Sequence, residues 1–235
     1  MKLLVRIGVL CALIIALNSS TTAEDGAAGN LFTIARLKYD GGGDWYSNPS
    51  SLPNLLAFFR EQTGIPAAPR EVVVAPSDRA IFKYPYLYMN GHGRINFSAE
   101  DVSNLHRFLT SGGFLHADDN YGMDESFRRE IKKVFPEAEL QEVPYSHPIY
   151  HSFFDFPQGP PKVHEHDGKP AQGLGIFYQG QLVVYYTYQS DLGDGWEDPD
   201  VHHDPEEIRQ AALKMGVNII IYALRRSELA VTSKG

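Results

Sequence analysis

Cysteine is almost absent from this sequence of 235 residues, since Cys11 is the only one. It lies in an N-terminal segment that we expect to be removed from the mature protein. Residues 8–10 lack the small residue that a lipoprotein signal carries just before its cysteine, so lipidation is not expected. A chain without a thiol has no disulfide, no cysteine-ligated zinc ion and no cysteine nucleophile. Thiolate catalysis is therefore excluded for the mature protein.

Long hydrophobic runs are also missing. The apolar core near the N-terminus, residues 7–17, is too short to span a bilayer comfortably, and no later run reaches that length. Lys2 and Arg6 precede this core and small residues follow it, which is typical of a secretory signal peptide cleaved before Glu24. We expect a signal peptide over residues 1–23 and a periplasmic or secreted protein without a membrane span. An uncleaved anchor is the alternative.

Positive charge is scarce. The sequence has 21 Lys and Arg against 29 Asp and Glu, a formal net charge of -8, and loss of residues 1–23 would leave -10. Nucleic acids are bound through basic side chains, so we expect no nucleic-acid partner, but a small molecule or a cell-envelope protein. One basic cluster has the spacing of the solvated face of a helix: Arg128, Arg129, Lys132 and Lys133.

What the sequence does contain is short apolar runs that alternate with helical patterns. This alternation is typical of a mostly parallel sheet covered by helices on both faces. Gln179–Gly180, between two apolar runs, predicts an antiparallel β-hairpin at the edge of the sheet. We therefore predict a three-layer α/β/α fold. The predicted strands are 32–39, 71–75, 86–89, 114–117, 174–178 and 182–187, and the predicted helices begin at or just after 51, 98, 124 and 204.

Local signals predict several helix ends. Ser98 with Asp101 has the pattern of a capping box, and Gly112–Gly113 ends the same helix. Gly64 ends the first helix, and the last helix runs to about Arg226.

Other segments depart from the alternation. Residues 144–173 hold six prolines and four histidines, and their aromatic residues need burial, so we predict a long ordered loop or lid. Residues 24–30 are small and polar and predict a flexible lead. We therefore expect one domain over 31–226, followed by a C-terminal tail over 227–235.

Five short motifs follow one another along the chain: Gly41–Tyr46, Gly91–Gly93, Gly112–Asp119, His147–Tyr150 and Ser190–Glu197. Their order resembles the DUF4159 domain, a bacterial family of unknown function, over nearly the whole chain from Leu31 to Arg226. That family is similar to class I glutamine amidotransferase-like domains, including the trehalose-utilisation (ThuA-like) proteins. The resemblance implies a flavodoxin-like three-layer fold.

One departure limits what the resemblance implies for activity. Amidotransferases of this class place a cysteine on the sharp turn after a central strand and pair it with His and Glu. The matching turn falls at 116–119 and holds no cysteine, so glutamine hydrolysis by a thiolate is excluded. ThuA-like chains also carry a Gly-His-Asp motif near the end. Gly193–Gly195 is the local counterpart, without the histidine.

His116, Asp118 and Asp119 form the first candidate cluster, at the end of a predicted strand. Ligands of open α/β sheets bind outside the carboxyl ends of the strands. In extended geometry His116 and Asp118 share a face and Asp119 points to the other. An imidazole with carboxylates can transfer protons or hold a metal ion. The alternative is that Asp118 or Asp119 caps the turn at 120–122.

A second acidic group follows the predicted hairpin. Oxygen-rich loops suit hard cations such as calcium, although the spacing differs from that of an EF-hand and a solvated acidic turn is the alternative. Asp191 follows a strand and could face the first cluster. The hypothetical catalytic set is therefore His116, Asp118, Asp119 and Asp191, with a divalent metal ion as the candidate cofactor. The acidic group itself comprises Asp191, Asp194, Glu197 and Asp198.

Histidines that lie close together in the sequence form a third group. Such pairs can bind zinc, but no HExxH motif is present, so surface or core histidines are the alternative. The pairs are His147 with His151, His164 with His166, and His202 with His203.

Two glycine loops follow predicted strands and could present backbone amides to an anion or a sugar. Neither matches a phosphate-binding fingerprint. The tryptophans beside the polar loops would suit stacking on a sugar ring, with a place in the core as the alternative. The candidate ligand-binding residues are Gly42, Gly43, Asp44, Trp45, Gly91, His92, Gly93, Asp194 and Trp196.

Three functions remain open. The missing nucleophile favours an exported, cysteine-less amidotransferase-like domain that binds a ligand or partner at the carboxyl edge of the sheet without turnover. A metal-assisted or acid/base hydrolase acting on a carbohydrate or cell-envelope compound is the first alternative. The second is a scaffold in an envelope assembly, with residues 144–173 as its contact surface. Such a fold hosts many chemistries, so the geometry of the site must decide.

Overall fold

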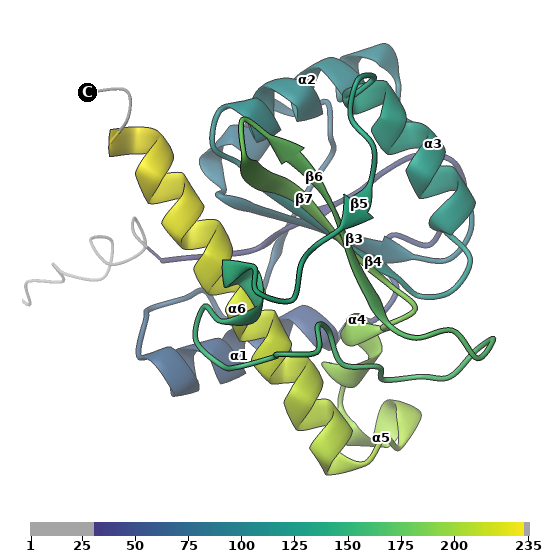
Figure 1. The fold of residues 1–235 in the computed structure, drawn as a ribbon, viewed down its shortest axis with the longest axis vertical. Helices are drawn as coiled ribbons and strands as arrows, with labels where there is room; N and C mark the ends of the chain where they lie inside the picture. The colour runs from purple at the N-terminus through teal and green to yellow at the C-terminus, as the bar shows by residue number, and fades with distance from the viewer. Residues whose placement is uncertain (1–30, 233–235) are drawn as a thin grey trace, which may run out of the picture. The chain divides into compact units, whose positions relative to one another are not determined.

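The structure is a computed structural model that describes residues 31–232 (Figure 1). Residues from Phe32 onward form one unit. The predicted signal peptide, the predicted lead and the last three residues of the predicted tail lie outside the described part of the chain. Within that part, no helix combines the length and the apolar character needed to cross a bilayer.

One sheet contains seven strands: β1 (Ala35–Leu37), β2 (Val72–Val74), β3 (Tyr86–Gly91), β4 (Phe114–Asp119), β5 (Gln141–Glu142), β6 (Gln172–Tyr178) and β7 (Gln181–Tyr188). Their order in the sheet is β2-β1-β3-β4-β7-β6-β5. The first five strands of this order are parallel, and β6 runs antiparallel to both of its neighbours. The predicted hairpin is β6–β7, and β5 adds a short strand beyond it.

The helical segments are α1 (Ser51–Thr63), η2 (Arg79–Lys83), α2 (Ala99–Thr110), α3 (Asp124–Val134), η3 (Pro148–Tyr150), α4 (Leu192–Gly195), α5 (Pro199–His202) and α6 (Glu206–Thr232). Helices α1 and α6 cover one face of the sheet, and α2 and α3 cover the other (Figure 1). The arrangement is the predicted three-layer α/β/α fold.

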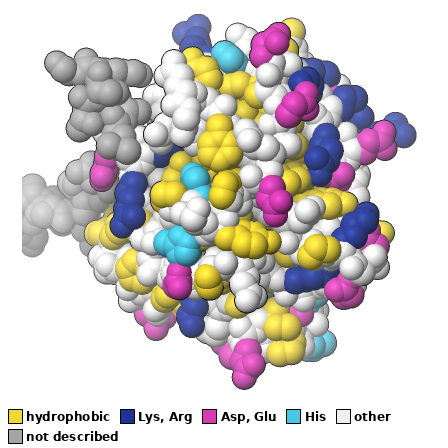
Figure 2. Space-filling view, in the orientation of Figure 1, with side chains coloured by type: hydrophobic (Ala, Val, Ile, Leu, Met, Phe, Trp, Pro, Cys, Tyr) yellow, Lys and Arg dark blue, Asp and Glu magenta, His cyan; other side chains and the backbone are white. Residues whose placement is uncertain are grey.

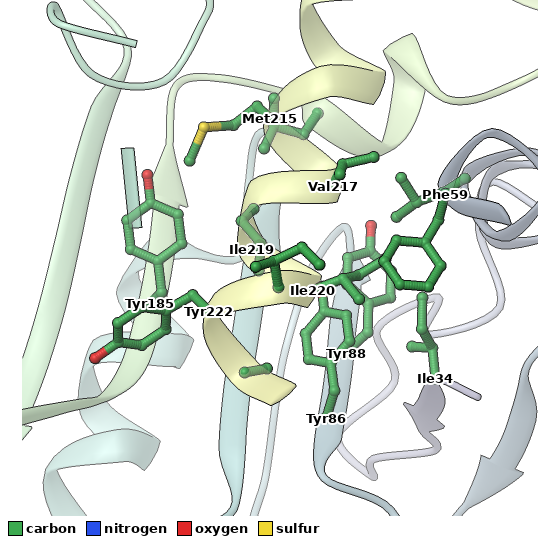
Figure 3. Packing of buried hydrophobic residues seen from close by; sticks show 14 of the residues in the cluster. Ile34, Phe59, Tyr86, Tyr88, Tyr185, Met215, Val217, Ile219, Ile220 and Tyr222 are labelled. Atoms are coloured by element: carbon green, nitrogen blue, oxygen red, sulfur yellow. The ribbon is translucent and has the colours of Figure 1, made fainter. Parts of the chain in front are cut away.

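Alternating side chains along β3 divide the core into two layers. Tyr86 and Tyr88 pack in the layer of α1 and α6, whereas Leu87 and Met89 pack in the layer of α2 and α3. The apolar middle part of α6 packs in the first layer. Figure 3 shows how its residues face the sheet tyrosines: Met215, Val217, Ile219, Ile220 and Tyr222.

Several predicted boundaries are confirmed. Ser98 and Asp101 form the capping box, in which the Ser98 hydroxyl accepts the Asp101 N–H and the Asp101 carboxylate accepts the Ser98 N–H. Gly64 ends α1 with a left-handed backbone, φ 70°. Gly113 has no room for a side chain, because a Cβ would lie 2.3 Å from the Phe108 ring.

Two segments near the C-terminus differ from prediction. The acidic segment after β7, expected as a loop, contains α4 and α5. Helix α6 continues past Arg226 to Thr232. The Arg226 side chain donates to the backbone oxygens of Leu109 and Gly113, at 2.6 and 3.1 Å. This long-range contact supports the last turns of the helix and leaves no local signal in the sequence.

The segment between β5 and β6 is mostly irregular, as predicted for residues 144–173, although β6 already begins at Gln172. Asn218 of α6 holds part of it in place. Its side-chain oxygen accepts the N–H groups of Phe153 and Phe154 at 3.0 and 2.7 Å, and its amide donates to the Phe154 oxygen at 2.8 Å. The segment is thus docked on the α6 layer.

The predicted basic face lies on α3, and Figure 2 shows Lys and Arg side chains gathered on that part of the view. Each cation has an acidic partner. Arg128 pairs with Asp124, Lys132 with Glu139, and both Arg129 and Lys133 with the buried Glu130. The local charge is therefore largely compensated, and this surface offers little attraction to phosphates.

Candidate functional site

Loops from neighbouring parallel strands meet at one edge of the sheet, which we call the carboxyl edge. They leave the sheet after β1, β3, β4 and β7, which are adjacent in that order. The long irregular segment joins them, because Val163 N donates to Ser190 O at 2.9 Å. Five chain segments distant in sequence therefore converge there.

His116 lies fully buried within β4. Its Nδ1 is 2.9 Å from the Tyr86 hydroxyl, and its Nε2 is 2.9 Å from the Thr187 hydroxyl. When Asp118 is ionised, the Thr187 hydroxyl donates to it and to Ala117 O, so Nε2–H donates to Thr187 and Tyr86 donates to Nδ1. Burial lowers the pKa of His116 to about 3. Both ring nitrogens thus form hydrogen bonds inside the core. The neutral ring links the Tyr86 hydroxyl to Thr187 and, through it, to Asp118.

This burial predicts an acid-sensitive contribution to stability. The folded protein keeps His116 neutral down to about pH 3, whereas the unfolded chain takes up the proton near 6.5. Its contribution is therefore fully present above pH 6.5 and is lost as the pH falls towards 3. In urea unfolding, we expect the loss of stability between about pH 7 and about pH 4 to be smaller in His116→Gln by roughly 3 kcal/mol.

The exposed His203 provides the matched control. His203→Gln should keep the loss of stability that the wild-type protein shows on acidification. An identical loss in His116→Gln and wild-type protein would contradict the buried neutral state of His116.

Asp118 is fully buried beneath the loop that follows β7. Its Oδ2 accepts Gly193 N–H at 2.6 Å, and its Oδ1 accepts Leu192 N–H at 3.3 Å and the Thr187 hydroxyl. Burial raises the pKa of Asp118 to about 8, against the lowering effect of the Thr187 and Gly193 hydrogen bonds. Asp118 therefore fixes the first turn of α4 and the acidic residues on both sides of that turn.

Asp119 points to the opposite face, as strand alternation predicts. Its Oδ1 accepts the N–H groups of Gly122 and Met123, both at 3.2 Å. Burial raises the pKa of Asp119, and these hydrogen bonds oppose the rise. Its contacts are those of a residue that caps the turn between β4 and α3.

Asp191 is the most unusual residue at the carboxyl edge. It is fully buried and has a left-handed backbone, φ 56°, which is costly for a residue other than glycine. Its Oδ2 lies 2.5 Å from Nε2 of His166, whose ring stacks on Tyr121. Its Oδ1 is buried and has no hydrogen-bond partner. Strain and a free buried carboxylate oxygen together favour a functional position.

Asp194 and His164 form the second part of the cluster. Asp194 Oδ2 lies 2.9 Å from His164 Nδ1, and Asp194 Oδ1 accepts hydrogen bonds from the amides of Asn48 and Asn120. The other ring nitrogen of His164 lies 3.0 Å from Oδ1 of Asp204. His164 is therefore clamped between two carboxylates.

The charges of this cluster are balanced by protons. The Asp194 hydrogen bond raises the pKa of His164 to about 9, against the effect of burial. Burial raises the pKa of Asp191 to about 7, and repulsion from Asp194 adds to this. The pKa of Asp194 is lowered, because hydrogen bonds from His164 and Asn48 outweigh burial, which acts to raise it. A bound cation would take over the role of the His164 proton.

Among residues 31–232, two overlapping sets could hold a metal ion: His164, His166 and Asp191, or His164, Asp194 and His202. In each set, one possible ligand atom per residue lies within 4.8 Å of the others. Each set offers two imidazoles and one carboxylate. Catalytic zinc sites use three such protein ligands and leave the next position to water or substrate.

The glycine loops after β1 and β3 lie side by side. Gly43 N donates to Arg94 O at 2.9 Å, and Asp44 N donates to His92 O at 3.2 Å. The Asp44 carboxylate also accepts His92 N–H, and its Oδ2 lies 3.0 Å from His92 Nδ1. The half-buried Trp45 is the remaining candidate of this loop.

Trp196 occupies a different environment from the other ligand-binding candidates. It is fully buried, and its indole N–H donates to Ala212 O at 2.8 Å. Its ring packs against Tyr88 and His116. Trp196 thus contributes to the core below the site and presents no face to solvent.

Comparison with known families identifies the family of this chain. The family described as "Domain of unknown function (DUF4159)" matches residues 33–224. The chain belongs to the DUF4159 family. No curated protein compared with it gave a match. The relation of this DUF4159 domain to glutamine amidotransferase-like domains stays a prediction.

In this DUF4159 domain, the predicted site residues fall into four places. One is the turn between β4 and α3, which Asp119 caps. Asp191 and Asp194 lie in the cluster with histidines, and Asp118 lies directly beneath it. His116 and Trp196 lie in the core. The glycine loops with Gly42, Gly43, Asp44, Trp45, Gly91, His92 and Gly93 occupy the neighbouring part of the edge, after β1 and β3.

Three histidines from the candidate zinc-binding pairs, which the sequence did not assign to the catalytic or ligand-binding set, join the cluster: His164, His166 and His202. The closely spaced pair His164 and His166 was the available signal. His202 carried a weaker one, because its sequence neighbour His203 joins neither candidate set. No sequence signal indicated Asp204 as the partner of His164, since the two residues are 40 positions apart.

Proposed function

We propose that this domain binds one divalent transition-metal ion at the carboxyl edge and uses it to activate water for hydrolysis. The ligands are His164, His166 and Asp191. The observation that carries the proposal is the buried Asp191 Oδ1, which lacks a partner beside two imidazoles. A metal ion would compensate this oxygen, and it would relieve the need for a proton on His164.

The donor set supports zinc or a similar ion. Two imidazoles and one carboxylate, with an open fourth position, occur in zinc hydrolases. Zinc at such a position lowers the pKa of a bound water towards neutrality. A carboxylate on the second ring nitrogen of a ligating histidine orients the ring. On His164, Asp204 would take this role if Nδ1 binds the ion, and Asp194 would take it if Nε2 does.

We also propose the substrate class and location that the sequence suggests: a carbohydrate or cell-envelope compound outside the cytoplasm. Tyr121, which stacks on His166, and Tyr46, in the loop after β1, are exposed. They offer aromatic faces of the kind on which sugar rings stack. A domain that binds its ligand without turnover would use the same edge, and a zinc-loaded protein without hydrolytic activity would favour it.

Zinc titration of the chelator-treated protein tests the metal site. Calorimetry measures the affinity, and elemental analysis measures the zinc bound per chain. We expect one zinc per chain in the wild-type protein. His166→Gln and Asp191→Asn should each lower the affinity at least 100-fold, because each removes one of three ligands.

His151→Gln is the matched control, because His151 also pairs with an aspartate, Asp155, but on an exposed segment. Its zinc affinity should equal that of the wild-type protein. Wild-type protein that binds no zinc would overturn the proposal. A loss in His202→Gln without a loss in His166→Gln would transfer the ion to the set with Asp194.

A further inference from the structure

A second histidine–carboxylate pair stands at the carboxyl edge, outside the histidine cluster. It joins Asp44, in the loop after β1, to His92, directly after β3. Asp44 Oδ2 lies 3.0 Å from His92 Nδ1, and Asp44 Oδ1 accepts the backbone N–H of the same residue. The His92 side chain is 55% exposed and the Asp44 side chain 33%. The carboxylate is therefore held at two points, and the imidazole reaches into solvent.

The backbone around this pair requires glycine. Gly91 has φ 135°, a conformation that other residues rarely adopt. A Cβ there would lie 2.5 Å from the Tyr39 hydroxyl and 2.9 Å from Asp44 Oδ1. Tyr39 is itself fixed by a hydrogen bond to Asn90 O at 2.9 Å. Only glycine at position 91 thus leaves room for the Asp44 carboxylate beside His92.

The contact also decides which nitrogen of His92 carries the proton in the neutral ring. Nδ1–H donates to the Asp44 carboxylate, so Nε2 keeps its lone pair. No residue in the described part of the chain forms a hydrogen bond with Nε2. An imidazole held in this tautomer by a carboxylate is the arrangement of a general base.

Three glycines, Gly43, Gly93 and Gly122, lie in sequence of contact between this pair and the histidine cluster. A Cβ on Gly93 would be 3.7 Å from Gly43 Cα, and a Cβ on Gly122 would be 3.9 Å from Gly93 N. Tyr121, next to Gly122, stacks on His166. Two strand spacings, roughly 10 Å, separate the ends of β3 and β7. A small molecule could therefore lie over bare backbone between the two groups.

We propose that His92 is a general base for a small molecule bound over Gly43, Gly93 and Gly122, and that Asp44 is its positioning residue. His92 Nε2 takes a proton from water as the water oxygen attacks an acyl carbon. The bond from that carbon to the leaving oxygen then breaks, and the imidazolium returns the proton to the leaving group. Water and ester give acid and alcohol, so no further reactant is needed.

Hydrolysis of 4-nitrophenyl acetate by the full chain tests this inference. Chelator is present throughout, so the outcome does not depend on the proposed metal site. We expect His92→Gln to lower the rate at least tenfold. His151→Gln should stay within twofold of the wild-type rate, because its Nδ1 also meets a carboxylate but its Nε2 is occupied by Tyr145 O.

Asp44→Asn separates positioning from folding. Nitrogen NMR of labelled histidine should show neutral His92 protonated at Nδ1 in the wild-type protein and mainly at Nε2 in Asp44→Asn, with a slower reaction. Equal rates in His92→Gln and wild-type protein would overturn the inference, as would an Nε2-protonated ring in the wild-type protein. Loss of zinc binding in His166→Gln alongside an intact ester reaction would support the two proposals separately.

Discussion

Replacing Arg36 with leucine is expected to lower the free energy of unfolding by about 3–5 kcal/mol, because it removes one partner from a buried ionic network. Arg36 lies in β1 and is 2% exposed. Its Nη1 donates to Ser47 O at 2.7 Å and to Asn90 Oδ1 at 2.9 Å, and its Nη2 donates to Asn48 O at 3.2 Å. Its Nε pairs with Glu71 at 3.5 Å. Urea unfolding measures the loss.

The same substitution should weaken metal binding, because Arg36 holds the loop that contains Asn48, and the Asn48 amide donates a hydrogen bond to Asp194. Arg36→Lys should recover little of the stability, since a single ammonium group cannot replace the fork of donors. The exposed Arg79 is the matched control, and Arg79→Leu should change stability by less than about 0.5 kcal/mol. Similar stabilities of Arg36→Leu and Arg79→Leu would show that the network contributes little.

Asp118→Ala is expected to cost about 2–4 kcal/mol of unfolding free energy and to lower zinc affinity about 10- to 100-fold. The substitution leaves Thr187, Leu192 and Gly193 without their buried acceptor. The first turn of α4 then loses its anchor, and Asp191 and Asp194 no longer keep their positions, although every metal ligand is still present.

Unfolding in urea and calorimetric zinc titration of the same sample measure both effects. Asp118→Asn should also destabilise, because its amide would place a second donor opposite Gly193 N–H. Asp200→Ala, at an exposed position of α5, is the control for removing one negative charge. Zinc affinity that falls equally in Asp200→Ala and Asp118→Ala would assign the effect to net charge instead of loop position.

The layers of the fold were predictable because they rest on short-range patterns. The capping box at Ser98 and the glycine at 64 are local features, and alternation along β3 and β4 separates the two core layers. The extension of α6 to Thr232 was not predictable. It depends on Arg226 reaching the end of α2, more than 100 residues away in sequence.

The position of the candidate site in the fold was predictable from its carboxylates, whereas for its histidines the sequence offered only their close spacing. Asp191 and Asp194 follow a strand, so their place at the carboxyl edge could be inferred from topology. His164 and His166 belong to an irregular segment without periodicity, and their position depends on one backbone contact, Val163 to Ser190. The burial of His116 was not predictable either, because a strand position near the edge gives no indication of how deeply the ring lies.

The contact between His166 and Asp191 spans 25 residues of a chain whose only cysteine lies in the predicted signal peptide. An ion held by both residues would close that stretch into a ring, the task that a disulfide performs in many exported proteins. Each tenfold excess of ion over its dissociation constant would then add about 1.4 kcal/mol to the free energy of unfolding. The free energy of unfolding would thus depend on the concentration of the metal ion around the protein.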